Sequence, residues 1–129
     1  MAWLRVYRWE SATWPEFRKV APLMEGQATK LLRKLSRHFK TPVPYLRLYG
    51  WNGGGRWRRG LVYHQITLSR PVAFDTLLHE FAHHLNFCRN RERGHRRSFK
   101  RELKRTYTWA RRYLPEEKSL LGLDALRRI

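Results

Sequence analysis

The chain carries the sequence DTLLHEFAHHL at residues 75–85, and its central five residues form the pattern HExxH. At 3.6 residues per turn, His79 and His83 lie on nearly the same side of a helix, about 6 Å apart. Two imidazole nitrogens at that spacing can share one tetrahedral Zn²⁺ at about 2.0–2.1 Å. Glu80 is rotated away from the pair, so we expect its carboxylate to reach a water molecule and act as general base. The motif therefore predicts metal-assisted hydrolysis.

The residues around the motif favour a helix. Asp75 is a good N-cap residue, and a buried apolar stripe is expected to border the two histidines. This stripe consists of Leu77, Leu78, Phe81, Ala82 and Leu85. His84 points about 100° away from His83, so we expect it to be exposed or to lie behind the ligands. Cys88 is expected to be a small buried hydrophobic residue near the helix end. The alternative to a metal site is a helix that carries surface or core histidines.

A third ligand is needed, because catalytic zinc sites usually have three protein ligands and a water. The polar, arginine-rich segment 86–94 ends in Gly94 and is expected to turn the chain back. A second helical pattern follows, with apolar positions at Phe99, Leu103, Tyr107, Ala110 and Leu114. His95 lies on the same stripe, at the first turn, and is our predicted third ligand. Glu102, two turns further on, is the alternative, either as third ligand or as a partner that orients a histidine.

Together these features resemble the SprT-like, or Spartan-type, zinc metalloproteases of the zincin class. The resembling stretch extends from about Leu31 to Tyr113, and it contains a helix, a strand at 44–49, a Gly/Arg loop, a strand at 60–69, the motif helix and the segment 94–100. In that family a His followed four residues later by Phe and Lys supplies the third zinc ligand. These positions correspond to His95, Phe99 and Lys100. The resemblance implies a Zn²⁺-dependent endopeptidase acting on protein or peptide substrates, and several family members act on proteins bound or crosslinked to DNA.

The resemblance also implies the fold, an α+β zincin-like metalloprotease core. In it a small mixed sheet packs on helices, and the HExxH helix lies at the active site. The strand before the metal helix commonly forms the sheet edge in zincins, where substrate adds as an extra strand, and residues 61–68 would have this role. Two features depart from the family. Arg96 replaces a Gly directly after the third His, and no Cys-rich zinc ribbon follows. The second departure implies a bare core, similar to the short minigluzincin-like proteins, in which Glu102 becomes the rival ligand.

Local patterns predict the remaining elements. Residues 3–9 alternate apolar and charged side chains, as in a strand, and Pro15 marks a helix start. A helix from Leu23 has an apolar face at Leu31, Leu32, Leu35 and Phe39. On the strand at 61–68, His64 interrupts a mostly apolar face, either as a hydrogen-bonded core histidine or as a partner near the zinc. Residues 120–129 form a short amphipathic tail that we expect to cap the core.

The chain is strongly basic, with 28 Lys and Arg against 10 acidic residues and a net charge of +18. Of these bases, 21 are Arg, which binds phosphate through two parallel hydrogen bonds. The electrostatic field of so large a positive charge attracts polyanions, and nucleic acid is the commonest polyanion inside cells. The predicted nucleic-acid contacts combine aromatic side chains that can stack on nucleobases with Arg and Lys side chains that can bind phosphate. They are Trp51, Arg56, Trp57, Arg58, Arg59, Arg96, Arg97, Lys100 and Arg101. The alternative is a solvated basic face that serves solubility or heat tolerance.

Length and composition predict a single domain over residues 1–129, because a chain of this size builds one core. The sequence shows no apolar run of membrane-spanning length, no signal-peptide pattern and only one Cys. We therefore expect a cytoplasmic monomer without a membrane partner. Two functions compete: a zinc-dependent endopeptidase, and a basic DNA- or RNA-binding module with a structural or vestigial zinc site. An intact Glu80 favours the enzyme. A magnesium-dependent nuclease is disfavoured because the chain has only two Asp residues.

Overall fold

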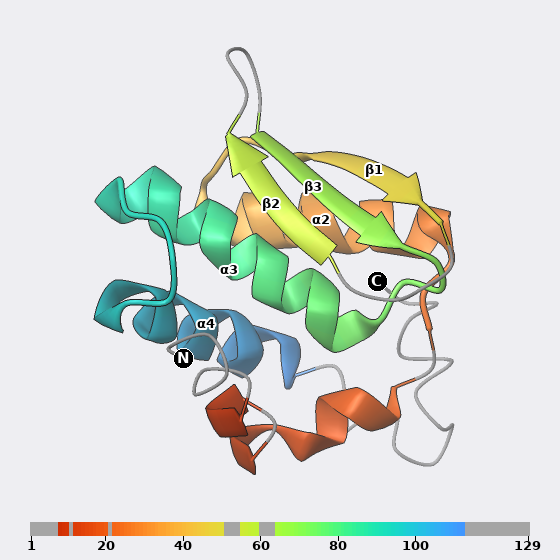
Figure 1. The fold of residues 1–129 in the computed structure, drawn as a ribbon, viewed down its shortest axis with the longest axis horizontal. Coiled ribbons are helices and arrows are strands. Elements are labelled where there is room, and N and C mark those ends of the chain that lie inside the picture. Colours follow the sequence, from red (N-terminus) through yellow and green to blue (C-terminus); the bar gives the residue numbers. More distant parts are fainter. Residues whose placement is uncertain (1–7, 11, 21, 51–54, 60–63, 113–129) are drawn as a thin grey trace.

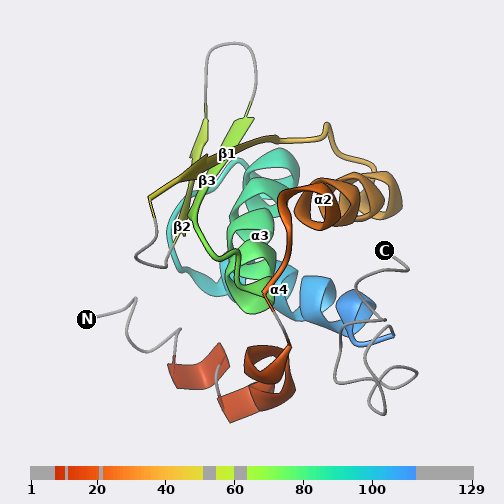
Figure 2. The same ribbon diagram turned by 90° about the vertical axis from the view of Figure 1, so that its right-hand side faces the viewer.

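A computed structural model of the chain describes residues 8–10, 12–20, 22–50, 55–59 and 64–112. Within these residues, three long helices accompany a three-stranded sheet (Figure 1). The helices are α2 (Glu25–Phe39), α3 (Phe74–Asn90) and α4 (Arg97–Ala110). Helix α3 lies between the sheet and α4, and α2 lies beside α3 (Figure 2). The mixed helix-and-sheet class predicted from the sequence is confirmed.

The sheet has the order β1-β3-β2 and is mixed. Strand β1 (Tyr45–Tyr49) is parallel to β3 (His64–Ser69), whereas β2 (Gly55–Arg59) is antiparallel to it. The prediction that the strand before the motif helix forms the sheet edge is wrong, because β3 hydrogen-bonds to a neighbour on each side. The Gly/Arg loop was also predicted incorrectly in part, since Gly55–Arg59 is a strand. Among the described strands β2 is an outer one, paired only with β3. An outer strand tolerates Gly and Arg better than a central one, because one of its sides can face solvent.

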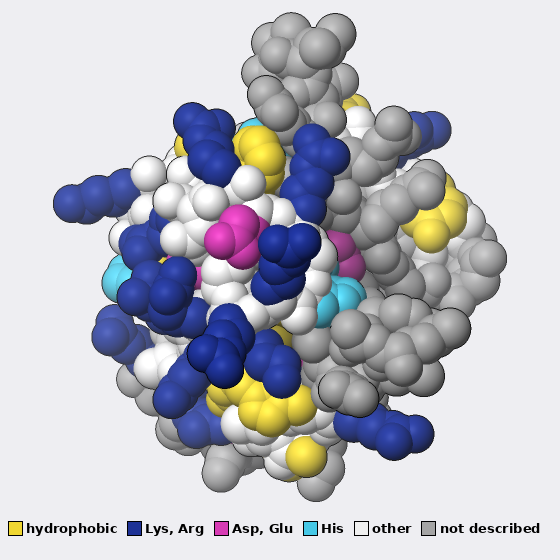
Figure 3. All heavy atoms as spheres, turned by 60° about the vertical axis from the view of Figure 1, so that its left-hand side comes forward, with side chains coloured by type: hydrophobic (Ala, Val, Ile, Leu, Met, Phe, Trp, Pro, Cys, Tyr) yellow, Lys and Arg dark blue, Asp and Glu magenta, His cyan; other side chains and the backbone are white. Residues whose placement is uncertain are grey.

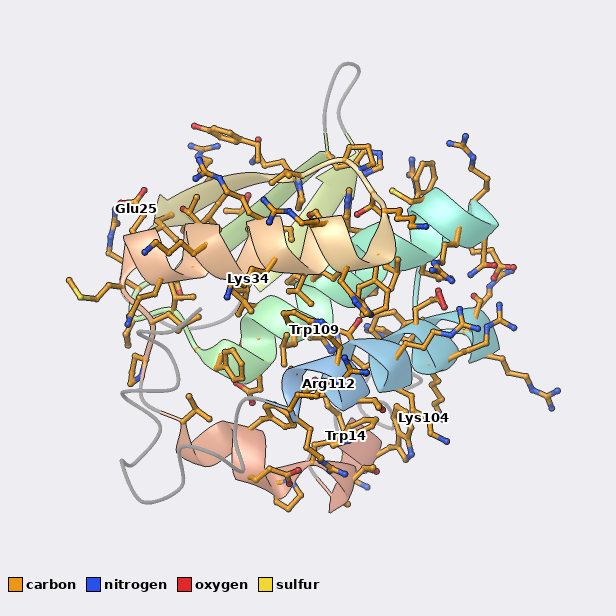
Figure 4. All side chains as sticks on the ribbon, turned by 180° about the vertical axis from the view of Figure 1, so that it is seen from behind. Trp14, Glu25, Lys34, Lys104, Trp109 and Arg112 are labelled. Carbon is orange, nitrogen blue, oxygen red and sulfur yellow. The ribbon has the colours of Figure 1, made fainter. Side chains whose placement is uncertain are left out.

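The core lies on both sides of α3. Its fully buried members include Leu31, Leu32 and Leu35 of α2, Ile66 and Leu68 of β3, Leu77, Leu78 and Phe81 of α3, and Phe99 and Leu103 of α4. The apolar stripes predicted for the three helices are therefore confirmed over the described residues. Trp109 lies buried between α4 and α2 and completes the core on the face that is opposite to the view of Figure 1 (Figure 4). None of the described helices is both long enough and apolar enough to cross a membrane.

Two helix starts differ from their predictions. Helix α3 begins at Phe74 with Ala73 as N-cap, so Asp75 is not the cap. Its carboxylate instead lies in the first turn, where Oδ1 accepts a hydrogen bond from the Thr76 amide at 2.9 Å and complements the helix dipole. Helix α4 begins at Arg97, so His95 precedes the helix and does not belong to its first turn. Gly94, with φ of +83°, makes the turn that sets this position.

The N-terminal segment is helical where it is described. Residues 8–10, 12 and 13 are helical and are followed by the 3-10 helix η1 (Pro15–Lys19). The strand predicted for residues 3–9 is therefore wrong at 8 and 9, and residues 3–7 lie outside the described residues. The segment is fixed by aromatic packing, since Trp14 stacks on Tyr107 of α4 with ring centroids 4.4 Å apart. The predicted tail at 120–129 also lies outside the described residues.

Candidate metal centre

Three histidines converge between the motif helix and the loop that precedes α4. His79 and His83 come from the same side of α3, as their spacing predicts, and His95 comes from the loop after Gly94. The Nε2 atom of His95 lies 3.2 Å from Nε2 of His79 and 3.1 Å from Nε2 of His83. One nitrogen from each ring lies within 4.8 Å of the other two, so the group is positioned to bind a metal ion.

The geometry of these nitrogens fits a tetrahedral metal. Imidazole bonds of about 2.0–2.1 Å at tetrahedral angles place ligand nitrogens about 3.3 Å apart. The two Nε2 separations are within a few tenths of an ångström of this value. His79 is almost fully buried, whereas His83 and His95 are only half-buried, so solvent reaches two of the three rings.

A carboxylate from the N-terminal segment orients His79. His79 Nδ1 donates a hydrogen bond to Glu10 Oε2 at 2.8 Å, which places the lone pair of the neutral ring on Nε2. The Tyr107 hydroxyl in turn donates to Glu10 Oε1. Glu10 is 69 residues from His79 in sequence, and no spacing rule connects them. Sequence reasoning therefore missed both Glu10 and the positioning role of Tyr107.

Burial keeps the two half-buried ligands neutral. Desolvation lowers the pKa of His83 from 6.5 to about 3, with the neighbouring His79 and His95 adding to the effect. Desolvation, followed by His79, lowers the pKa of His95 to about 4, although Glu10 opposes this shift. Neutral imidazoles are the form that binds a metal, so these two rings are ready to bind at neutral pH.

Phe99 forms an aromatic floor under the cluster. Its fully buried ring stacks on His83 with centroids 4.1 Å apart, and it contacts His79 at 5.0 Å and His95 at 4.8 Å. All three imidazoles therefore rest on one side chain of α4. This packing restricts the orientations of the three rings.

The two acidic candidates are placed differently. Glu80 is buried on α3, one residue after His79. Glu102 is also buried, but its Oε1 accepts a hydrogen bond from Arg105 Nη1 at 2.7 Å, and its Oε2 lies 3.8 Å from Arg89 Nε. Among the described residues it is His95, not Glu102, that joins the two histidines of the motif.

A second group able to bind a metal ion lies on the other side of α3. It consists of His64 at the start of β3 and of His84 and Cys88 on α3. Of the two alternatives predicted for His84, exposure is wrong, because the side chain is completely buried and its Nδ1 lies 2.7 Å from His64 Nδ1. Burial lowers the pKa of His84 to about 4 and raises the pKa of the Cys88 thiol. His64 belongs to this group rather than to the site of His79.

The predicted nucleic-acid contacts are only partly described. Trp51 and the side chains of Arg56, Trp57, Arg58 and Arg59 lie outside the described residues. Arg96, Arg97 and Arg101 are exposed, and the Lys100 ammonium lies 5.3 Å from the centroid of the Trp9 ring. Figure 3 looks toward the end of the molecule where α3 ends and α4 begins, and Lys and Arg side chains cover much of that face.

Comparisons of the chain with protein families, with curated proteins and with solved structures gave no match. The interpretation of the centre therefore rests on the residues and the geometry described above.

Proposed function

We propose that the chain is a zinc-dependent endopeptidase. The observation that carries the proposal is that the Nε2 atoms of His79, His83 and His95 lie close together. They do so beside the helix that also holds Glu80. Structural zinc sites are closed by four protein ligands, whereas catalytic sites have three and keep one position open. Within the described residues the group has three members, two of which are partly exposed, and this favours catalysis. Neutral imidazoles at tetrahedral spacing suit Zn²⁺.

The chain's own residues supply the remaining chemistry. A bound zinc ion would polarise a peptide carbonyl and make water more acidic. The Glu80 carboxylate takes a proton from the attacking water and delivers it to the leaving amine nitrogen as the C–N bond breaks. Glu10 accepts the Nδ1 proton of His79 and so holds that ring in the tautomer that leaves Nε2 free for the metal. Phe99 keeps the ligand rings in place.

A zincin-like core of the SprT-like type accounts for the order of these parts. A mixed sheet lies against the HExxH helix, and the chain then turns to bring back His95, followed by Phe99 and Lys100. Because β3 is central, we assign the substrate edge to the outer strand β2, which is antiparallel to β3 and lies against α3. An extended substrate strand would add to the side of β2 that pairs with no other strand among the described residues.

The basic surface supports a substrate associated with nucleic acid. Arg96, Arg97 and Arg101 extend into solvent beside the metal centre, in the segment that also supplies His95. Further along, a hollow of about 290 Å³ is lined by Lys104 and Trp109 of α4, by Arg112 just after it and by His38 of α2 (Figure 4). Cations distributed in this way attract a phosphate backbone without reading its sequence. The alternative is a nucleic-acid-binding module with a structural zinc, in which a general base such as Glu80 would have no function.

The decisive experiment compares metal content and peptide cleavage in matched variants. Glu80→Gln should keep zinc at the wild-type stoichiometry and lose cleavage of an unfolded protein substrate by at least about 100-fold. His95→Ala should lose zinc from this centre, and Glu102→Gln should keep it. Glu25→Gln is the control, because Glu25 is an exposed carboxylate on α2 (Figure 4). Wild-type cleavage by Glu80→Gln would refute the mechanism, and zinc loss in Glu102→Gln alone would reassign the third ligand.

A second experiment tests the role of the basic surface. Cleavage of a DNA-binding protein should be faster in the presence of DNA, and the increase should disappear in the triple variant Arg96→Ala, Arg97→Ala, Arg101→Ala. Cleavage of a free peptide should not change in this variant, because its substitutions leave the three histidines in place. Equal rates with and without DNA at low salt would remove nucleic acid from the proposal.

A further inference from the structure

Helix α3 carries a second pair of metal-binding side chains at the same spacing as the first. His79 and His83 are four residues apart, and so are His84 and Cys88. The second pair follows the first by five residues, which rotates it away from the His79 side of the helix. It faces the first residue of β3, where His64 completes a group of two imidazoles and one thiol.

The distances in this group are close to those of a metal site with one sulfur ligand. Cys88 Sγ lies 3.9 Å from His64 Nδ1 and 4.0 Å from His84 Nδ1. Metal bonds of about 2.3 Å to sulfur and 2.0–2.1 Å to nitrogen give a separation of about 3.6 Å at tetrahedral angles. The two Nδ1 atoms are 2.7 Å apart, so metal entry would separate the rings by about half an ångström.

A backbone carbonyl already orients the buried imidazole. His84 Nε2 lies 2.8 Å from the Pro42 oxygen. A carbonyl oxygen only accepts, so Nε2 carries the hydrogen and the lone pair of the neutral ring is on Nδ1, which faces His64 Nδ1. Cys88 Sγ lies beside the ring, 4.0 Å from Nδ1 and 3.8 Å from Nε2. The same arrangement holds His79 against Glu10. In both groups on α3, therefore, one buried histidine has one ring nitrogen hydrogen-bonded and the other ring nitrogen directed at another histidine of its group.

We propose that His64, His84 and Cys88 form a second metal site, which binds a borderline or soft transition-metal ion such as Zn²⁺ through two Nδ1 atoms and one thiolate. A thiolate with two imidazoles is the ligand set that such ions prefer over Mg²⁺ or Ca²⁺. The ion ties the start of β3 to the last turns of α3. Through His84 it also fixes the segment between α2 and β1, where Pro42 lies. Bound there, the ion would hold the sheet against the helix that carries the HExxH motif.

The metal-free alternative is an ordinary hydrogen bond, in which His64 Nδ1 donates to His84 Nδ1. Metal binding would release the Cys88 thiol proton and move the His64 hydrogen to its other ring nitrogen. The two states therefore differ in thiol reactivity as well as in metal content. Cys88 is the only cysteine of the chain, so any thiol measurement reports this site alone.

Zinc stoichiometry after chelator treatment and reconstitution separates the two sites. We expect two zinc ions per wild-type chain, one in His95→Ala, one in Cys88→Ser and none in the double variant. His38→Ala is the matched control with two, since His38 is an exposed histidine outside both groups. If wild type and His95→Ala each bind one ion and Cys88→Ser none, the second site stands and the proposed peptidase centre fails. One ion in both wild type and Cys88→Ser would overturn the second site.

Cobalt substitution and thiol alkylation give readouts that folding alone does not move. Reconstitution with Co²⁺ should produce a sulfur-to-cobalt charge-transfer band in wild type and His95→Ala, and no such band in Cys88→Ser. Zinc should slow alkylation of Cys88 by at least tenfold in wild type, and this protection should disappear in His64→Ala. An absent band in cobalt-loaded wild type, or alkylation that is equally fast with and without zinc, would overturn the proposal.

Discussion

Removal of the Glu10 carboxylate should weaken metal binding at the histidine centre without touching a ligand. Glu10 accepts from His79 Nδ1 at 2.8 Å and from the Tyr107 hydroxyl, and both contacts are buried. Partners of this kind typically contribute a factor of about 10–100 to metal affinity, because they fix the tautomer and increase the basicity of the ligand nitrogen. We expect Glu10→Ala to weaken zinc binding by this factor, which corresponds to about 1.4–2.7 kcal/mol.

The same change also lowers the stability of the metal-free fold. The His79 N–H loses its buried acceptor, which costs about 1–3 kcal/mol. Tyr107 loses less, because its hydroxyl also lies 3.3 Å from the Asp75 carbonyl oxygen. Glu10→Gln keeps an acceptor oxygen and removes only the charge, so we expect a loss of less than about tenfold in affinity. Tyr107→Phe keeps the stacking on Trp14, and its effect should be smaller than that of Glu10→Ala.

The assay is competition for zinc against a chromophoric chelator, with urea denaturation of the metal-free variants measured in parallel. Cys88→Ser serves as the background, so that only the histidine centre is titrated. If Glu10→Ala folds and binds zinc within twofold of its background, the orienting role assigned to Glu10 is wrong. If only stability falls, Glu10 is a structural residue of the core.

Three further predictions concern the support of the centre. Gly94→Ala should cost about 1 kcal/mol and weaken zinc binding, because φ is +83° next to His95. Gly26→Ala, in helix α2 with open space around it, should be neutral or stabilising, and the opposite order in urea denaturation would contradict this. Phe99→Ala should lower the free energy of unfolding by about 3–5 kcal/mol, and a loss below 1 kcal/mol in the same assay would contradict its role as the floor. Stability of the metal-free protein should fall with pH from about 6.5 toward 3–4, since His83 and His95 protonate in the unfolded chain before they do in the fold. A flat urea midpoint between pH 7 and 4.5 would contradict the lowered pKa values.

The local parts of the centre could be predicted because they depend on short spacings. The four-residue step of His79 and His83 fixes their common side of α3, and the apolar residues around them fix which side is buried. The return of the chain near Gly94 was likewise predictable, since glycine readily adopts a positive φ. The predicted loop at 86–94 is shorter than expected, because α3 continues to Asn90 and ends with Arg91 in the left-handed conformation. These features follow from helix geometry and from the backbone freedom of one residue type.

The errors occurred where an outcome depends on partners far away in sequence. A strand of given composition can be central or outer, and only the pairing of β3 with both β1 and β2 makes it central. His84 looks polar and exposed from its neighbours, yet Pro42 and His64 approach it from other elements and bury it. Polar side chains can be buried when partners far away in sequence satisfy their hydrogen bonds. The pattern of apolar and polar residues around them in the sequence does not reveal such partners.

The sequence by itself determined the HExxH helix, the His pair on one of its sides, the basic charge and the candidate third ligands His95 and Glu102. Tertiary structure decided which of the two lies beside the pair, because the turn after α3 brings His95 there whereas Glu102 contacts Arg105 and Arg89. It also brought Glu10 to His79 across 69 residues, and His64 to His84 and Cys88. Spacing along a helix is fixed by its period, but contacts between elements are fixed by how their apolar faces pack.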